Sequence, residues 1–141
     1  MKVFVIVFML ALFYHCECRK LSRCGLVREL RKNNFHESRI RDWVCLVEKS
    51  SRRQTGAVSK KHSDGSRRFG LFQISDEHWC SNSTKPGKEC NVTCKQISSA
   101  NVMKAARCAK KIHHREGFDA WSAWKDHCKG KPLPDISSCK K

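Results

Sequence analysis

Cysteines constrain this chain more than any other residue type. The sequence has ten of them, and eight lie at positions 24, 45, 80, 90, 94, 108, 128 and 139. An even number of cysteines in a short domain is typical of a disulfide framework, which forms in an oxidising compartment. Spacing alone does not select the pairs, because eight cysteines allow about a hundred pairings.

The beginning of the chain predicts a secretion signal. The run from Val3 to Tyr14 is almost wholly apolar, yet it is shorter than the roughly 20 residues of a membrane-spanning helix. Cleavage after Cys18 would remove a signal peptide at 1–18 and leave a single domain at 19–141. The alternative is that Cys16 or Cys18 survives as a free thiol. No second apolar run follows, so we expect a secreted, extracellular protein without a transmembrane segment.

The chain is strongly basic, with 29 Lys and Arg against 13 Asp and Glu and a net charge of +16. Such a charge attracts polyanions in general, including bacterial envelopes, acidic glycans, anionic lipid and nucleic acid. We do not expect nucleic acid as a partner, because the chain carries a secretion signal and no recognised nucleic-acid motif. The alternative is a basic secreted protein whose charge serves only as a solvated face.

Apolar residues at helical spacing predict a mostly helical domain. Ser22 is the expected N-cap of a first helix, and Ser38 is the expected N-cap of a second, which begins near Ile40. A third helix is expected over 99–113, and a short one over 118–125.

The segment between the second and third helices has a different pattern. Residues 52–75 are punctuated by glycines, and the pair Asp64-Gly65 is a hairpin signal. A loop region crowded with cysteines, from Cys80 to Cys94, follows. The expected fold class is therefore α+β, mostly helical with one small antiparallel sheet.

Sequence blocks around the cysteines carry a family resemblance that covers the mature chain. They are Cys24-Gly-Leu-Val-Arg-Glu-Leu, Trp43-Val-Cys-Leu-Val-Glu, Gly65-Ser-Arg, Gly70-Leu-Phe-Gln-Ile, Trp79-Cys80, Pro86-Gly-Lys-Glu-Cys-Asn-Val-Thr-Cys94, Cys108-Ala-Lys-Lys-Ile, Phe118-Asp-Ala-Trp and Leu133-Pro-Asp-Ile. In these blocks the chain resembles the c-type lysozymes, and the insect branch most closely. The resemblance implies a helical lobe and a β-lobe with a cleft between them, in a family that hydrolyses the sugar backbone of bacterial cell walls. It also implies four disulfides, Cys24–Cys139, Cys45–Cys128, Cys80–Cys94 and Cys90–Cys108.

Both catalytic carboxyl groups are missing at the positions that the resemblance assigns to them. Lysozyme is itself the type case of a glycosidase with one protonated and one ionised carboxyl group. The general acid lies five residues after Cys45, where this chain has Ser50, and the second carboxylate lies two residues before Gly70, where it has Arg68. A serine hydroxyl is too weak an acid, and arginine stays positively charged. We therefore expect a lysozyme-like protein that is catalytically inactive.

Other acids are not expected to replace the missing pair. Glu48 is two residues from Ser50, so on a helix it points elsewhere. Asp64 lies in the predicted hairpin turn. Asp76 and Glu77 are expected to face solvent.

The groove that binds the sugar is expected to persist in part. Gln73, Trp79 and Trp121 match residues that line the family's groove, and Ser75 stands in place of a sugar-binding asparagine. His78 replaces an aromatic residue that commonly flanks this groove. Even Trp121 has packing in the core as its alternative role.

No cofactor or metal is expected. The histidines do not follow zinc spacing, and no acid between Glu89 and Glu116 supplies calcium ligands there. Asn82 and Asn91 begin glycosylation sequons. Asn82 is the expected acceptor, whereas occupancy of Asn91, close to two cysteines, stays open.

The sequence thus predicts a secreted, cationic, monomeric protein of innate defence. It would bind peptidoglycan or a related glycan, and the anionic bacterial surface, without hydrolysis. One alternative is an active lysozyme, that is, a bacteriolytic muramidase. A second is a cationic antimicrobial protein that kills without enzymatic activity.

Overall fold

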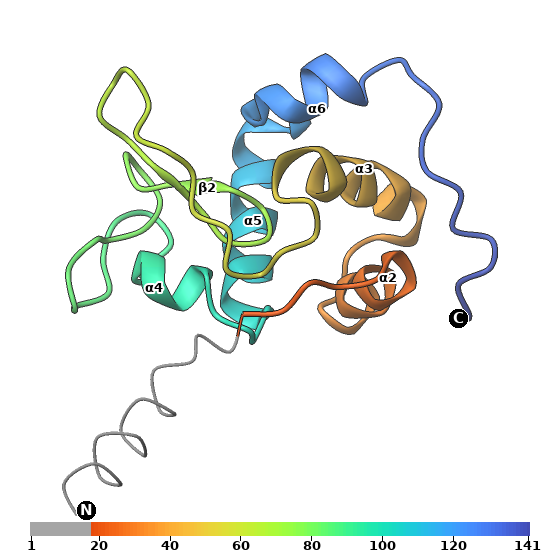
Figure 1. The fold of residues 1–141 in the computed structure, drawn as a ribbon, viewed down its shortest axis with the longest axis horizontal. Helices are drawn as coiled ribbons and strands as arrows, with labels where there is room; N and C mark the ends of the chain where they lie inside the picture. The colour runs from red at the N-terminus through yellow and green to blue at the C-terminus, as the bar shows by residue number, and fades with distance from the viewer. Residues whose placement is uncertain (1–17) are drawn as a thin grey trace, which may run out of the picture.

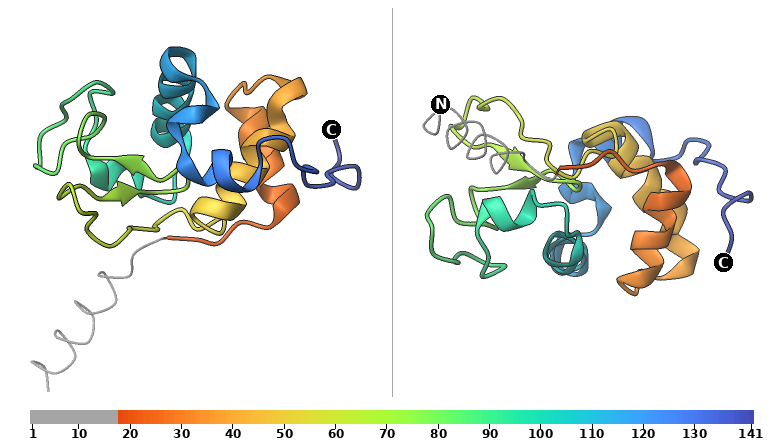
Figure 2. Two further views of the ribbon diagram at one scale, coloured as in Figure 1. Left: turned by 90° about the horizontal axis from the view of Figure 1, so that it is seen from above. Right: turned by 60° about the horizontal axis from the view of Figure 1, so that its bottom comes forward.

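Helices form one lobe of the protein, and a two-stranded sheet with long loops forms the other (Figure 1). The computed structural model describes residues 18–141. The helices are α2 (Arg23–Lys32), α3 (Ile40–Ser50), α4 (Cys94–Ile97), α5 (Met103–Glu116) and α6 (Ser122–His127), with 3-10 turns η1 (Glu37–Arg39) and η2 (Phe118–Ala120). Helix α5 lies between the β-lobe and the α2–α3 pair (Figures 1 and 2). The predicted α+β fold class is confirmed.

The first helix forms as its sequence predicts. Ser22 caps α2, because its hydroxyl accepts a hydrogen bond from the backbone N–H of Gly25 at 2.9 Å. Leu26, Val27 and Leu30 point into the core, as the spacing of apolar residues along this helix requires.

The second helix begins differently from the prediction. Ser38 is not its N-cap, because a 3-10 turn at Glu37–Arg39 precedes α3 and takes up Ser38. The Ser38 hydroxyl instead contacts Nδ1 of His36 at 2.7 Å.

The third and fourth predicted helices are also shifted. Helix α5 begins at Met103 and not at Ser99, because the Ser99 hydroxyl donates to backbone carbonyls, one of them that of Gln96 at 3.0 Å. The predicted helix at 118–125 is divided into η2 and α6, because Trp121 has an extended backbone with φ −108° and ψ 112°.

The sheet is smaller than predicted. Strand β1 (Arg68–Phe69) pairs with β2 (Ile74–Ser75) in antiparallel register, with Arg68 opposite Ser75. The Asp64-Gly65 turn lies before β1 and not between the two strands. It still reverses the chain, since the N–H of His62 donates to the carbonyl of Ser66 at 2.8 Å.

Gly70 ends β1 at a point where a side chain has no space, so we expect the Gly70→Ala variant to be destabilised. Its φ is +75°, and an added Cβ would collide with the backbone carbonyl of Ile97 on α4. Left-handed backbone and overpacking together cost roughly 3 kcal/mol. Gly65 is the matched control, because its φ is +84° but nothing lies within 4 Å of an added Cβ. Urea unfolding should show Gly65→Ala losing about 1 kcal/mol, and equal losses would contradict the steric argument.

One aromatic cluster joins the lobes. Trp43 of α3 packs against Phe72 of the β-lobe at 5.8 Å between ring centroids, and against Trp121 at 5.5 Å. The Trp121 indole N–H donates to the Phe72 carbonyl at 2.8 Å. Since Phe72 is fully buried, this contact fixes the β-lobe relative to the helices.

His113 of α5 packs at the edge of this cluster, with its ring centroid 4.3 Å from that of Phe118 and 5.2 Å from that of Trp43. Burial lowers the pKa of His113 from its ordinary value of 6.5, and the nearby Arg39 and His114 act in the same direction against Asp42. The unfolded chain therefore binds the proton more readily than the folded protein does. Stability is fully present above about pH 6.5 and is lost as the pH falls toward the folded pKa.

Replacing His113 by Phe should remove this part of the pH dependence. The aromatic packing is kept, whereas the titrating group is lost. Thermal unfolding of wild type and His113→Phe should differ more at pH 5 than at pH 8, with the wild type losing more stability on acidification. The exposed His114 serves as the control, and His114→Phe should keep most of the wild-type pH dependence, because burial is the largest cause of the His113 shift.

Disulfides cross-link segments within both lobes. The pairs are Cys24–Cys139, Cys45–Cys128, Cys80–Cys94 and Cys90–Cys108, which are the pairs implied by the family resemblance. The first joins α2 to the C-terminal tail, which runs beside the helical lobe (Figure 1).

Arginines hold this irregular tail to the helices. Arg41 of α3 donates to the carbonyls of Leu133 and Pro134 at 2.8 and 2.9 Å. Arg31 of α2 donates to the carbonyl of Lys140 at 2.8 Å. Side chains thus replace the backbone partners that a helix or sheet would have provided.

Within residues 18–141, none of the helices combines the length and the apolar character needed to cross a bilayer.

Candidate functional site

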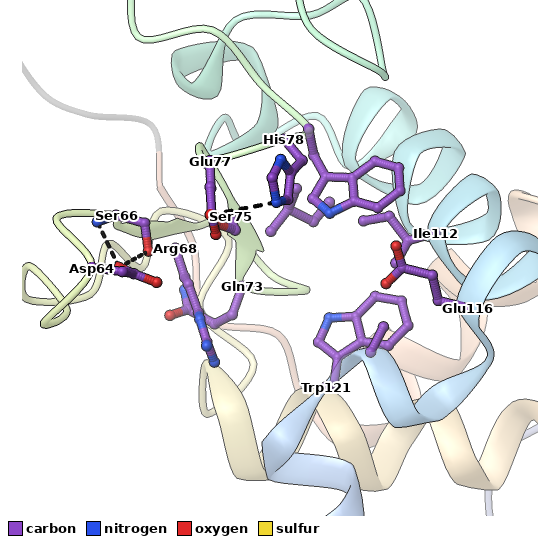
Figure 3. A pocket seen from close by; sticks show the side chains of 13 residues that line it. Asp64, Ser66, Arg68, Gln73, Ser75, Glu77, His78, Ile112, Glu116 and Trp121 are labelled. Atoms are coloured by element: carbon purple, nitrogen blue, oxygen red, sulfur yellow. Dashed lines mark hydrogen bonds and ion pairs between the residues drawn. The ribbon is translucent and has the colours of Figure 1, made fainter.

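A groove between the β-lobe and the end of α5 is the candidate site (Figure 3). It encloses about 200 Å³. Its lining comes from residues far apart in sequence, namely Asp64, Ser66, Arg68, Gln73, Ile74, Ser75, Glu77, His78, Trp79, Ile112, Glu116, Ala120 and Trp121.

The structure brings together all four residues that the sequence assigns to sugar binding. Gln73, Ser75, Trp79 and Trp121 line this groove. Gln73 has a left-handed backbone with φ +48°, and its amide donates to the carbonyls of Ala57 and Gly70 at 3.1 and 3.0 Å. Its side-chain nitrogen is therefore committed to the loop, which leaves the amide oxygen as the group able to accept from a ligand.

The two tryptophans are mostly buried. Trp121 is 5% exposed and Trp79 is 7% exposed. The indole N–H of Trp121 is already bonded to Phe72, so this side chain serves core packing as well as the groove wall. The guanidinium of Arg115 lies over the Trp79 ring at 5.2 Å from its centroid, a cation–π contact that fixes the ring.

Ser50 does not reach the groove. It is the last residue of α3 and is half-buried. Its hydroxyl donates to the carbonyl of Leu46 at 2.7 Å, one turn back along its own helix. The hydroxyl proton of Ser50 is thus engaged by the backbone. Ser50 is also absent from the groove lining.

Arg68 does reach the groove. Its backbone N–H donates to the Ser59 hydroxyl at 2.9 Å, which holds β1 in place. Its guanidinium contacts the hydroxyl of Ser122, at the start of α6, at 3.4 Å. A positive charge therefore extends from the β-lobe toward the helical lobe.

Two of the alternative acids have structural roles away from the groove. Glu48 forms a bidentate ion pair with Arg23, with distances of 2.7 and 3.0 Å. The expectation that Asp76 faces solvent is wrong, because it is 8% exposed. Its carboxylate accepts hydrogen bonds from the backbone N–H of Arg67 at 2.8 Å and from the side-chain amide of Asn82.

Three other acids line the groove, namely Asp64, Glu77 and Glu116. Hydrogen bonds from the hydroxyl and N–H of Ser66 lower the pKa of Asp64, which keeps it ionised. Glu77, which is exposed as predicted, lies 3.5 Å from His78. Glu116, the last residue of α5, was missed from the sequence, although its i+4 spacing from Ile112 places both on one helix face.

The surroundings of these three acids do not favour a general acid among them. A general acid needs an apolar pocket that raises its pKa, whereas Asp64, Glu77 and Glu116 are all exposed. The pKa of Asp64 moves in the opposite direction. The acids of the groove thus lack the apolar surroundings that a general acid needs.

Asn82 and Asn91 are both exposed. The side-chain nitrogen of Asn82 is the atom that would carry a glycan, and it donates a hydrogen bond to Asp76 in the folded protein. No group of three His, Cys, Asp or Glu side chains in the described part of the chain is placed to hold a metal ion.

Comparison with known proteins identifies the family of this chain. Residues 19–139 match the C-type lysozyme/alpha-lactalbumin family. A lysozyme of Hyalophora cecropia is 50% identical over 98% of this chain and 99% of its own length. A lysozyme of Bombyx mori is 49% identical over 99% of this chain and all of its own length.

Solved structures agree with the sequence relatives. Canine milk lysozyme is 30% identical, with a TM-score of 0.77 over 87% of this chain and 100% of its own chain. The fold is thus shared along the whole solved chain. The chain belongs to the C-type lysozyme family.

Proposed function

We propose that this protein is a secreted, non-hydrolytic member of the C-type lysozyme family, which binds bacterial cell-wall or related glycans. One observation carries the proposal: the guanidinium of Arg68 lies in the groove, at the position where the family resemblance places a catalytic carboxylate. The Ser50 hydroxyl, at the position of the general acid, is bonded to its own helix.

The charge at Arg68 opposes hydrolysis directly. Cleavage of a glycosidic bond passes through a positively charged sugar. A like charge about 4 Å away repels that sugar by roughly 4 kcal/mol at an effective dielectric constant near 20. This repulsion corresponds to about three powers of ten in rate, before the loss of the general acid is counted.

Glycan binding is supported by what the groove retains. Gln73, Ser75, Trp79 and Trp121 still line one concave surface. Sugar recognition needs an apolar ring face and hydrogen-bonding groups, and neither depends on the two lost carboxylates. The net charge of +16 would add attraction to anionic bacterial surfaces.

The remaining parts of the proposal come from the sequence. A signal at 1–18 and a single mature domain at 19–141 would deliver a monomeric protein to the extracellular space. Recognition of bacterial glycans there favours a role in innate defence.

Two parallel assays test the proposal. The purified mature protein should leave the turbidity of a bacterial wall suspension unchanged, yet it should sediment with insoluble peptidoglycan and be released by a soluble oligosaccharide competitor. Loss of turbidity would instead show an active lysozyme. Killing of bacteria that fades with salt, without competition by oligosaccharide, would show a cationic antimicrobial protein.

A further inference from the structure

The guanidinium of Arg68 has donors to spare. It carries five N–H groups, and its side-chain contact is the 3.4 Å approach to the Ser122 hydroxyl. Within residues 18–141, no carboxylate lies within ion-pair distance of it. A half-buried cation in a groove, with most of its donors unused, is an open position for an anionic group.

One acid of the groove, Asp64, lies near this position, and its charge interacts with that of Arg68. Figure 3 shows the end of Arg68 beyond Gln73, on the side of the groove facing Trp121 and away from Glu77. Asp64 forms no ion pair with Arg68, and one oxygen of its carboxylate accepts from the N–H and hydroxyl of Ser66 at 2.8 and 2.6 Å.

We propose that Arg68 makes the groove selective for acidic sugars, that is, for glycans with a carboxylate on or beside the sugar ring. This inference rests on the proposed glycan-binding function. The planar fork of a guanidinium matches a carboxylate with two parallel hydrogen bonds. The substitution that removes the catalytic anion would then also supply a cation for recognition.

The other exposed acids of the groove restrict the ligand further. Glu77 lies on the β-lobe side and Glu116 on the α5 side (Figure 3), and each would repel a second carboxylate placed beside it. The groove therefore fits a chain in which acidic and neutral sugars alternate, with an acidic sugar at Arg68. Two sources share this chemistry: uronic-acid polymers, and peptide-free bacterial wall strands with free lactyl carboxylates.

Calorimetric titration of the mature protein with three probes tests the inference. The probes are a chitin hexasaccharide, which is neutral, a hyaluronan hexasaccharide, in which uronic acid and neutral sugars alternate, and peptide-free wall strands. We expect at least one acidic probe to bind about tenfold tighter than chitin, as charge-assisted hydrogen bonds of this kind support. Which acidic probe binds tighter identifies the source.

Arg68→Gln and Arg67→Gln form a matched pair. Both remove one positive charge, and Arg67 is the neighbouring residue, which lines a different depression with Asp76 and Asn82. Arg68→Gln should lower affinity for the acidic probe about tenfold, to the level that chitin shows with the wild type. Arg67→Gln should keep the preference. Thermal unfolding checks that both variants fold.

The outcomes separate this inference from the function on which it rests. Equal binding of acidic and neutral probes, unchanged by Arg68→Gln, would overturn the selectivity and leave glycan binding intact. Equal losses in both variants would show attraction by net charge and also overturn it. Absence of binding to every probe would overturn both proposals.

Discussion

Replacing Ser50 by Glu and Arg68 by Asp together should produce a protein that clears a suspension of bacterial walls. The double variant restores an acid at the end of α3 and an anion on β1. Exchange of a repelling for an attracting charge near the developing cation is worth up to about 8 kcal/mol at an effective dielectric constant of 20. The expected gain is several powers of ten in rate over the wild type.

Each single change should stay close to inactive. Ser50→Glu alone leaves the positive charge of Arg68 in the groove, and Arg68→Asp alone provides no proton donor. The pairing of Ser50→Glu with Arg67→Asp is the control, because it adds the same charges with the second one outside the groove lining. A folded double variant that still fails to lyse walls would mean that changes elsewhere in the groove also prevent catalysis.

Removing the Cys24–Cys139 disulfide should cost the most stability. This bond has a sequence separation of 115 residues and joins α2 to the tail. In the chain-entropy account, cross-linking so long a loop stabilises the fold by about 5 kcal/mol. The double variant Cys24→Ala/Cys139→Ala should therefore unfold at much lower denaturant concentration than the wild type.

The Cys80–Cys94 pair gives the internal comparison. Its sequence separation is 14 residues, and the same account gives about 3 kcal/mol for a loop of that length. Guanidinium unfolding should show a larger loss for Cys24→Ala/Cys139→Ala than for Cys80→Ala/Cys94→Ala. The free energies of unfolding of the two variants should differ by about 2 kcal/mol. Equal losses, or a larger loss for Cys80→Ala/Cys94→Ala, would mean that native contacts and not loop length set the effect.

The helix-start signal predicts the first helix correctly and the second incorrectly. Ser22 caps α2 through Gly25, three residues on. Ser38 has the same kind of signal, yet its hydroxyl contacts His36, and the Ser99 hydroxyl, at the expected start of the third helix, donates to the carbonyl of Gln96. A serine before an apolar run predicts a helix start, but competing partners in a preceding turn can take its hydroxyl.

The site was harder to predict, because its contacts are distant in sequence. The groove residues and the two altered catalytic positions came from the family resemblance, since no local pattern marks them. The contact of Arg68 with Ser122 spans 54 residues. The burial of Asp76 depends on Asn82 in the following loop, and Glu116 meets the β-lobe only after α5 is packed.

The way in which the C-terminal tail is fastened bears on the electrostatics of the whole molecule. A backbone carbonyl is neutral, so Arg41 anchors the tail without an acidic partner, whereas Arg31 holds the tail and also pairs with Glu37 at 2.6 Å. Ion pairs at the same places would have consumed some of the protein's 13 acidic residues. Attachment of the C-terminal tail through backbone carbonyls is therefore compatible with a strongly positive electrostatic potential at the protein surface.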